Sequence, residues 1–335
     1  MSKAGMITPE MTALLRKSGS ERYEEAVAGM REFAKAIQTP LREGVQSGDI
    51  VVGAGIFSVE VFAPGASVEY PLDFLAPGTE KDFVAYTIPR HGRLPERTIE
   101  SDYVMVPTYS VGNTIDWLLK YARDARWPVI QRAMKVFEAG FTKKMNDDGW
   151  HTLLSAGVDR NIVVYDADAA AGQFTKRLIS LMKTVMRRNG GGNSTSQNRR
   201  QLTDAYMSPE GIEDIRNWGV DQVDEVTRRE IYQAADGRIN KIFGVNLHDL
   251  DELGEGQEYQ SFFSQQLSGA LASGDVELVV GMDLSKNDSF MMPVREPMKV
   301  FEDPALHRQQ RQGYYGWQEH GFAALDGRNI ILGSY

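Results

Sequence analysis

The chain contains five histidines, and histidine is the side chain best suited to proton transfer and metal binding near neutral pH. They are His91, His151, His248, His307 and His320. No two of them have the i, i+4 spacing that would place two metal ligands on one face of a helix. We therefore interpret them as separate surface or core residues. Cysteine is absent from the sequence, which excludes disulfides, thiolate nucleophiles and cysteine-based zinc sites.

The acidic residues near position 250 come nearest to a cation-binding motif. Asp249, Asp251 and Gly254 match the first, third and sixth positions of a calcium-binding EF-hand loop. However, Leu253 stands where an oxygen ligand is required, and Gln260 replaces the glutamate that binds calcium with both oxygens. The sequence also lacks the GxGxxG, GxxxxGKS/T, GxSxG and HExxH motifs. We expect no catalytic residue, no metal site and no cofactor.

Basic residues in the middle of the chain gather on both sides of a glycine-rich segment. Arg187 and Arg188 precede the sequence "GGGNSTSQN" at 190–198, and Arg199 and Arg200 follow it. The helix dipole favours cations at the C-terminal end of a helix, and this is our preferred interpretation of Arg187 and Arg188. The alternative is a loop that faces an anion or a nucleic acid.

The composition is that of a globular protein with an acidic balance. The 335 residues include 42% hydrophobic and 25% charged residues, and the formal net charge is -9. We do not expect such a chain to hold nucleic-acid phosphates or an anionic membrane through its main surface. The N-terminal region lacks the apolar stretch of a secretory signal, and no apolar run approaches the length of a membrane span.

Two helices are expected near the N-terminus. Thr8 and Pro9 form a helix start, and residues 18–21 have the spacing of a second one. An apolar stripe follows at three- and four-residue intervals, made of Tyr23, Ala26, Val27, Met30, Phe33, Ala34 and Ile37. This stripe packs on its own domain or docks on a neighbouring subunit, and the sequence leaves both alternatives open. We expect removal of residues 1–40 to prevent orderly assembly and to leave a folded core.

Residues 50–110 are expected to form strands and hairpins, because short β-branched or aromatic runs alternate with glycine and proline turns. The basic sequence "PRHGRLPER" predicts a long hairpin whose charged tip contains Arg90, Arg93 and Arg97. Two strands of that length need another surface to lie on.

A long helical tract is expected from Asn113 to Met145. Pro128 either kinks this tract or lies in the first turn of a second helix. The polar sequence "NDDG" at 146–149 is expected to end the tract, and residues 150–156 to form a further short helix.

Helices and short strands are expected to alternate from residue 159 to 276. The sequence "AYMSPEGIEDI" predicts a strand that ends at Met207 and a helix with Ser208 as its N-cap and Pro209 in its first turn. Strands follow from Val276 onward, with a hairpin turn at Asp326-Gly327. The other expected elements are helices at 168–188, 223–234 and 259–272 and a strand at 239–247.

Several of these elements are larger than a compact enzyme requires. They are a terminal arm, a projecting hairpin, a long helix and a set of closing strands. Elements that cannot bury their apolar faces on their own domain indicate burial on other copies of the chain.

This order of elements resembles the Hong Kong 97-type major capsid proteins of tailed bacteriophages. The resemblance extends from about residue 20 to residue 335. It includes the phrases "DYVMVPTYSVGNTIDWLLKYARDARW", "LTDAYMSPEGIEDI", "GRINKIFGVNLHDLDELGEG" and "DLSKNDSFMMPVREPMKVFEDP". It implies an α+β fold made of an N-terminal arm (1–50), a strand segment leading into the peripheral domain (51–75), an extended loop (76–105), a peripheral domain with a long spine helix (106–159), an axial domain (160–275) and the C-terminal strands of the peripheral domain (276–335).

The resemblance also implies a function without enzymatic activity. Copies of the chain would form the hexamers and pentamers of an icosahedral phage head that encloses double-stranded DNA without sequence-specific binding. The head would be assembled in the host bacterial cytoplasm, and the protein would reside in the virion. Some capsid proteins of this type carry a long N-terminal assembly domain where this chain has a short arm, which implies a separate scaffolding protein. A portal at one vertex and a cement or decoration protein are further expected partners, and a membrane is not.

Candidates for contacts between subunits follow from this resemblance. We hypothesise that Arg90, Arg93 and Arg97 at the hairpin tip meet acidic residues on the spine helix or arm of a neighbouring subunit. Tyr23, Met30 and Phe33 of the arm are candidates for the same kind of contact. The nearest alternative function is an encapsulin, a bacterial shell protein of the same fold that encloses an enzyme. The remote alternative is a cytosolic α+β enzyme, which would need perturbed titratable groups in a pocket.

Overall fold

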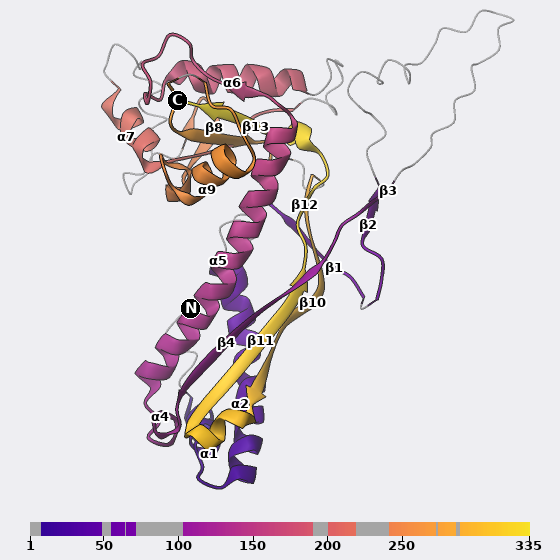
Figure 1. The fold of residues 1–335 in the computed structure, drawn as a ribbon, viewed down its shortest axis with the longest axis vertical. Helices are drawn as coiled ribbons and strands as arrows, with labels where there is room; N and C mark the ends of the chain where they lie inside the picture. Colours follow the sequence, from indigo (N-terminus) through magenta and orange to yellow (C-terminus); the bar gives the residue numbers. More distant parts are fainter. Residues whose placement is uncertain are drawn as a thin grey trace, which may run out of the picture. The chain divides into compact units, whose positions relative to one another are not determined.

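The chain folds into two compact units, each built from segments that are far apart in the sequence (Figure 1). This computed structural model describes residues 8–48, 55–63, 65–71, 103–189, 200–218, 241–272, 274–285 and 289–335. Unit 1 comprises Met1–Glu69, Met105–Gly149 and Met291–Ala323, and unit 2 comprises Tyr70–Val104, Trp150–Phe290 and Ala324–Tyr335. The mixture of helices and sheets confirms the predicted α+β class.

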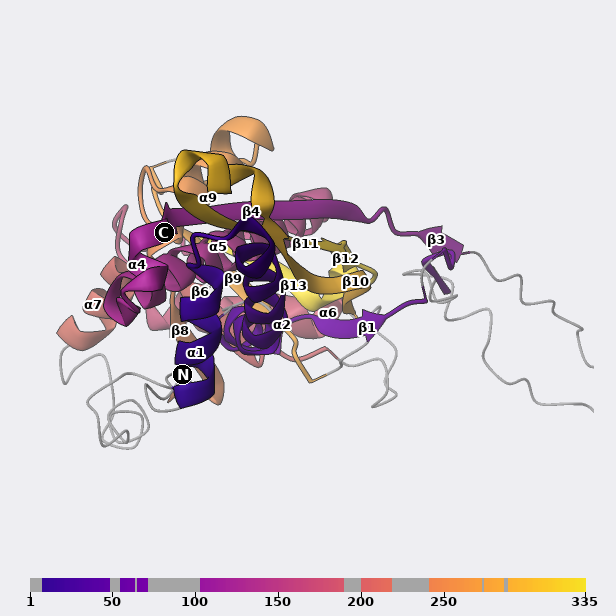
Figure 2. The same ribbon diagram turned by 90° about the horizontal axis from the view of Figure 1, so that it is seen from below.

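The N-terminal helices belong to the core of unit 1. Helix α1 (Pro9–Ser18) begins after Thr8, whose hydroxyl accepts a 3.1 Å hydrogen bond from the backbone nitrogen of Met11. Helix α2 (Tyr23–Gly48) packs beside α1, as Figure 2 shows. Most of the predicted apolar stripe is buried there, and the ring of Phe33 lies 5.6 Å from that of Tyr314. The stripe therefore packs on its own unit, which is the first of the two alternatives, and this burial argues against the expectation that a folded core remains without residues 1–40.

A five-stranded sheet forms the other half of unit 1. Its strand order is β1 (Ser58–Val61), β10 (Phe290–Asp303), β11 (Arg311–His320) and β4 (Tyr109–Leu118), and the short β12 (Ala323–Ala324) also pairs with β10. Strand β1 is parallel to β10, whereas β10, β11 and β4 are antiparallel. The register of β11 on β4 is unbroken from Arg311↔Leu118 to His320↔Tyr109.

The helical tract predicted from Asn113 to Met145 differs from the structure at both ends. Residues 113–118 belong to strand β4, which is followed by the short helix α4 (Leu119–Arg123). Helix α5 (Trp127–Asp159) starts with Pro128 in its first turn, which confirms the second of the two alternatives for that proline. It continues through "NDDG" and includes the expected short helix at 150–156.

Ion pairs along α5 explain why the polar sequence does not end the helix. Lys143 pairs with Asp147 at 3.4 Å and Lys144 with Asp148 at 2.6 Å, both at the i, i+4 spacing that stabilises helices. Trp150, Leu153 and Leu154 follow directly and are fully buried. Favourable pairs and a buried apolar face thus outweigh the low helix propensity of Asn, Asp and Gly.

Unit 2 is built on a six-stranded sheet. Its order is β5 (Val163–Val164), β13 (Ile330–Ser334), β9 (Leu278–Met282), β6 (Asp204–Met207), β8 (Val245–Asp249) and β7 (Lys241–Ile242). Strands β13, β9 and β6 are buried along their whole length, as expected for central strands covered on both faces. A separate two-stranded sheet pairs β2 (Glu69–Pro71) with β3 (Tyr103–Met105).

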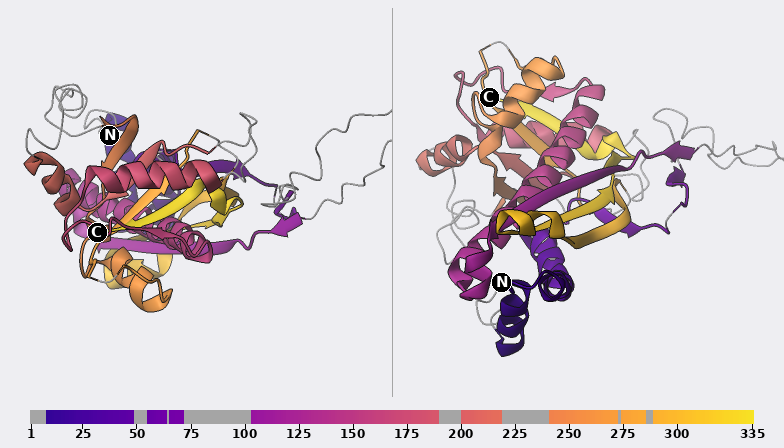
Figure 3. Two further views of the ribbon diagram at one scale, coloured as in Figure 1. Left: turned by 90° about the horizontal axis from the view of Figure 1, so that it is seen from above. Right: turned by 60° about the horizontal axis from the view of Figure 1, so that its bottom comes forward.

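Alternating side chains of β6 define the two faces of this sheet. Ala205 and Met207 pack in the apolar cluster formed with helices α6 (Lys176–Asn189) and α7 (Pro209–Asn217). Tyr206 points the other way, where its ring lies 5.0 Å from that of Trp150 in α5. Trp150 in turn stacks at 6.0 Å on Tyr259 of α9 (Glu258–Ser261). Helices α6 and α9 therefore lie on opposite faces of the sheet (Figure 3, left).

Local signals placed several elements of unit 2 correctly, and others were wrong. Strand β6 ends at Met207 and α7 begins after Ser208, as predicted. Helix α6 starts at Lys176 instead of 168, because Gly172 has φ +73, outside the helical region, and Thr175 accepts a hydrogen bond from the nitrogen of Leu178. The helix expected at 259–272 ends as regular structure at Gln266.

Asp326-Gly327 is not the hairpin turn that the sequence predicted. The side chain of Asp326 accepts a 3.0 Å hydrogen bond from the nitrogen of Arg328 and caps a short 3-10 helix, η5 (Gly327–Asn329). Strand β13 then pairs with β9 and β5. The predicted C-terminal segment 276–335 is consequently divided, since only Met291–Ala323 belongs to unit 1.

Two predicted elements fall mainly or wholly on residues outside the described ranges. They are the extended loop at 76–105, of which only 103–105 are described, and the helix at 223–234.

Candidate functional site

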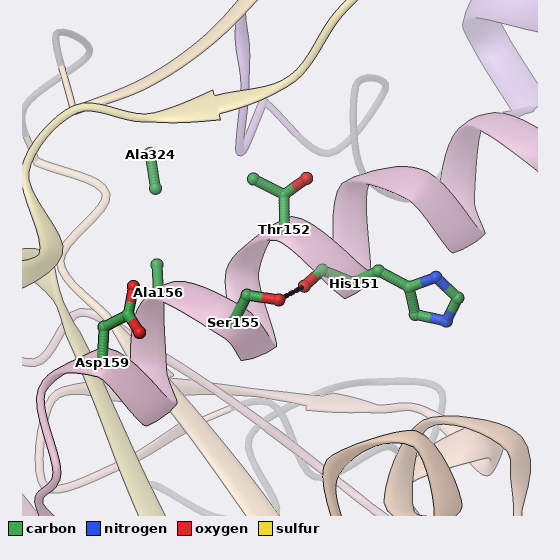
Figure 4. Close-up of a pocket in the computed structure, with 6 residues that line it drawn as sticks. All are labelled: His151, Thr152, Ser155, Ala156, Asp159 and Ala324. Carbon is green, nitrogen blue, oxygen red and sulfur yellow. Dashed lines mark hydrogen bonds between the residues drawn. The ribbon is translucent and has the colours of Figure 1, made fainter. Parts of the chain in front are cut away.

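One face of helix α5 carries the three residue types of a hydrolase triad. His151, Ser155 and Asp159 follow one another at four-residue intervals and line a shallow pocket of about 370 Å³ in unit 2. Thr152, Ala156 and Ala324 complete its wall (Figure 4).

The geometry of this pocket does not support nucleophilic catalysis. Ser155 donates its hydroxyl proton to the backbone carbonyl of His151 at 2.7 Å, so the hydroxyl is not bonded to an imidazole base. The ring of His151 stacks on Phe262 at 3.8 Å and points away from Ser155 and Asp159 (Figure 4). A nucleophile and its base must be within hydrogen-bond reach, and this pair is not arranged in that way.

A second acid–base pair joins two strands of unit 2. Nε2 of His248 lies 2.9 Å from Oδ1 of Asp204, and Nδ2 of Asn246 donates to the same oxygen at 3.1 Å. Burial raises the pKa of Asp204, but hydrogen bonds from His248, Thr203 and Asn246 outweigh it, so the pKa is lowered overall. The register of β6 on β8 places Asp204 opposite Asn246 and Tyr206 opposite His248. The pair therefore ties two parallel strands together.

The strongest polar cluster surrounds Ser208. Its hydroxyl bonds the carboxylate of Glu277, lies 2.7 Å from the hydroxyl of Tyr335 and accepts a 3.2 Å hydrogen bond from the nitrogen of Gly211. All three side chains are buried. Ser208 is thus an N-cap whose oxygen is fully engaged inside the unit, and it is not available as a nucleophile.

His320 lies in the interior of unit 1. It is fully buried in β11, and neither of its ring nitrogens has a hydrogen-bond partner. Burial lowers its pKa to about 4, opposed by Asp148 and assisted by Lys144. The ring packs 5.3 Å from Tyr109 and 5.4 Å from Phe322. A neutral histidine enclosed in this way is part of the core.

The acidic sequence near position 250 is not a calcium loop. Asp251–Leu253 form a 3-10 helix, η2, and the side chain of Leu253 is fully buried. Within the described residues, no group of histidine and carboxylate side chains is placed to hold a metal ion. Nor does any helix in the described part of the chain have the length and apolarity needed to cross a membrane.

The predicted contact residues have different fates. Met30 and Phe33 are fully buried in unit 1, so their side chains serve the core of their own chain in this conformation. Tyr23 is 54% exposed and touches His307, which leaves it as a contact candidate. Arg90, Arg93 and Arg97 lie outside the described residues.

Strands β1 and β3 carry exposed apolar side chains that the sequence did not predict as contact residues. Val61 in β1 and Met105 in β3 are each 68% exposed, and Val59 and Tyr103 are exposed in the same two strands. A short run such as "SVEV" predicts a strand, but it does not tell which face of the strand lacks a covering layer. Clusters of exposed apolar residues are typical of surfaces that bind other chains.

Comparison of the sequence with family models and with curated proteins gave no match.

Similar solved structures, by contrast, are phage and particle capsids. The Cyanophage Pam1 capsid has a TM-score of 0.54 and 12% sequence identity, over 81% of this chain and 85% of that chain. The capsid of Myoviridae phage XM1 has a TM-score of 0.51 and 12% identity, over 85% and 91% of the two chains. The capsid of an empty GTA particle has a TM-score of 0.52 and 13% identity, over 83% and 87%.

The chain has the Hong Kong 97-type capsid fold. The low identities explain why the fold is recognisable only from the order of elements and the structure. Helix α5 includes residues 127–145 of the tract predicted as the spine helix, and the six-stranded sheet of unit 2 includes β5, β6, β7 and β8 from the segment 160–275 predicted as the axial domain.

Proposed function

We propose that the chain is the major capsid protein of a tailed bacteriophage. Its copies form the hexamers and pentamers of an icosahedral head that encloses double-stranded DNA. The observation that carries this proposal is the similarity of fold to solved capsids over 81% to 85% of the chain.

The polar clusters of the described residues support a structural role. Ser208, Asp204 and Ser155 each use their side chains to join strands and helices of one unit. Exposed apolar residues in β1 and β3 supply surface for contacts with other copies. The net charge of -9 suits a container that confines DNA without holding its phosphates tightly.

The partners in this proposal are other copies of the chain, a separate scaffolding protein, a portal at one vertex and a cement or decoration protein. Assembly takes place in the cytoplasm of the host bacterium, and the mature location is the virion. The arginines of the predicted hairpin tip, Arg90, Arg93 and Arg97, bind acidic residues of a neighbouring subunit.

The test is electron microscopy of the purified protein, expressed in bacteria alone and together with a scaffolding protein. Closed shells or capsomer rings support the proposal, whereas a small discrete oligomer under both conditions contradicts it. Shells filled with one cellular protein would instead support an encapsulin, the alternative function of this fold. Packaged DNA in particles from infected cells would support the phage head.

A further inference from the structure

A basic pocket lies on the α6 face of the sheet in unit 2. It has a volume of about 760 Å³, and its charged lining consists of Lys183, Arg187, Arg188 and Arg200. No acidic side chain lines it among the described residues. Lys183 donates a hydrogen bond to the backbone carbonyl of Phe243, which holds the ammonium group at the rim. We call this site the basic pocket.

Arg200 is a buried residue of the basic pocket with hydrogen-bond donors that lack an acceptor. Its side chain is only 6% exposed, yet Nε and Nη1 have no hydrogen-bond partner. Its one ion-pair partner among the described residues is Asp326, which Arg328 also binds, at 2.8 Å and 2.9 Å. The carboxylate of Asp326 therefore serves two guanidinium groups, and Nε and Nη1 of Arg200 are left without a hydrogen-bond acceptor. Burial of hydrogen-bond donors without an acceptor is costly, so a further carboxylate or phosphate would be stabilised beside these two nitrogens.

Arg187 and Arg188 extend this excess of charge to the surface. Both are exposed in the last turn of α6, and neither makes an ion pair within the described part of the chain. The helix dipole explains why cations are tolerated at this end, as the sequence predicted. It does not supply an anionic partner for their guanidinium groups, which bind carboxylates and phosphates in a planar, two-pronged geometry.

The same unit carries an acidic segment, residues 249–258, which runs from the last residue of β8 to the first residue of α9. It contains five acidic residues and no lysine or arginine: Asp249, Asp251, Glu252, Glu255 and Glu258. Asp249, Asp251 and Glu255 are exposed and form no ion pair within the described residues. The segment leads into α9, whereas the basic pocket is lined by α6, and these helices lie on opposite faces (Figure 3, left). None of these acidic residues lines the basic pocket or forms an ion pair with its arginines among the described residues.

We propose that the basic pocket of one copy receives carboxylates of the acidic segment of the next copy, chiefly Asp251 and Glu255. This contact rests on the proposed function, because a ring of identical subunits requires two different, complementary patches on each copy. Two separate patches of opposite charge on each copy meet that requirement and fix the order of neighbours. A phosphate of DNA is the less favoured occupant, since nucleic-acid surfaces are extended and basic, while this unit exposes an acidic segment as well.

The test is a charge swap in the full chain. R187E/R188E reverses the rim of the pocket, and D251K/E255K reverses the acidic segment. Each double variant is expected to lower the yield of shells or rings by about tenfold or more, because like charges then face each other. The variant with all four substitutions is expected to regain a yield within about twofold of the unsubstituted protein, because the attraction is restored with its sign exchanged. Arg200 is left unchanged because its pairing with Asp326 is internal.

A charge-conserving variant and thermal unfolding distinguish a loss of assembly from a loss of folding. R187K/R188K keeps the charge and is expected to assemble at nearly the unsubstituted yield. Thermal unfolding of each unassembled variant checks that the exposed substitutions leave the unit folded. Yields are measured by sedimentation and electron microscopy at one protein concentration and one salt concentration.

Different results overturn different claims. If the unsubstituted protein forms no shells or rings, the proposed function fails and this contact fails with it. If the unsubstituted protein forms shells and both charge-reversed variants assemble with the same yield as it does, only the contact is refuted. A four-substitution variant that stays folded but does not recover also refutes the pairing. Normal assembly of R187E/R188E with loss of bound nucleic acid would assign the pocket to phosphate instead.

Discussion

The hydroxyl of Tyr335 donates a 2.6 Å hydrogen bond to Oε2 of Glu277, and both side chains are buried. Ser208 bonds both of them, so the end of β13, the start of β9 and the N-terminus of α7 meet at one point. Burial raises the pKa of Tyr335, and Glu277 raises it further, so the hydroxyl keeps its proton and remains a donor. This cluster explains how a short strand turns directly into a polar helix at Met207.

Replacing Tyr335 with phenylalanine tests that cluster. The ring is kept, but the buried carboxylate of Glu277 loses a donor, which is expected to cost about 1–3 kcal/mol in the free energy of unfolding. Urea denaturation of the unassembled protein measures the change. Y165F is the matched control, since Tyr165 is exposed, and its effect is expected within about 0.5 kcal/mol. Equal losses from both variants would contradict the role assigned to Tyr335.

Two helix N-caps, Ser208 and Thr8, provide a second comparison of stability. Ser208 caps α7 from a buried position, and Thr8 caps α1 from an exposed one. S208A is expected to destabilise the unassembled protein by about 2 kcal/mol, because the cap and the bond to Glu277 are both lost. T8A is expected to cost about 0.5–1 kcal/mol, because water replaces the cap there. Unfolding curves that rank the two variants in the reverse order would refute this account.

His320 predicts a pH dependence of stability. In the folded chain its pKa is lowered to about 4, chiefly by burial, so it stays neutral at mildly acidic pH. In the unfolded chain an ordinary histidine takes up a proton below about pH 6.5. The unfolded state therefore binds more protons, and stability falls as the pH drops from about 6.5 towards 4.

The measurement compares unfolding free energies at pH 7.5 and pH 5.8, a range above the sequence pI of about 5.2. His320 is expected to contribute about 1 kcal/mol to the decrease over that interval. H320F cannot titrate, so its decrease should be smaller than that of the unsubstituted protein by this amount. An identical pH dependence in both proteins would mean that the pKa of His320 is the same in the folded and the unfolded chain.

Local chemistry was sufficient to predict some elements from the sequence. Thr8-Pro9 and Ser208-Pro209 each combine a cap with a proline in the first turn, and both helices begin there. Helix α6 ends at Asn189, one residue beyond the predicted end at 188. These signals depend on residues within one turn of each other, and for that reason they survive without knowledge of the rest of the chain.

Long-range pairing was the part that the sequence did not reveal. Ile115 and Leu118 have helical spacing with their neighbours, yet β4 forms because it pairs with β11, about two hundred residues later. Asp326-Gly327 resembles a hairpin turn, but β13 finds better partners in β9 and β5. The basic pocket is another long-range grouping. Its lining brings Arg187 and Arg188 together with Arg200 and Phe243, which are distant in the sequence, and no local pattern predicts this.

The fate of the arm residues yields a further prediction. Phe33 is fully buried, and F33A is expected to destabilise the unassembled protein by about 3–5 kcal/mol, through lost packing against Tyr314 and Trp127. Tyr23 is 54% exposed, so Y23A is expected to change the unfolding free energy by less than about 1 kcal/mol. If Tyr23 is a contact between subunits, Y23A lowers shell yield nonetheless. Normal shells from Y23A would remove Tyr23 from the contact surface.

The predicted hairpin tip is tested by reversing its charges. R93E/R97E is expected to lower assembly yield and to make the remaining shells less resistant to heat, because the tip would then repel acidic neighbours. K241E/R308E is the control, since it makes the same change in net charge at two exposed residues, Lys241 and Arg308, outside the tip. Particle yields from sedimentation are compared for the two double variants. A control that loses as much yield as R93E/R97E would show that net charge, and not the tip, limits assembly.

R93K/R97K completes the comparison, because it keeps the charge and should retain most of the yield if electrostatic attraction is the main contribution.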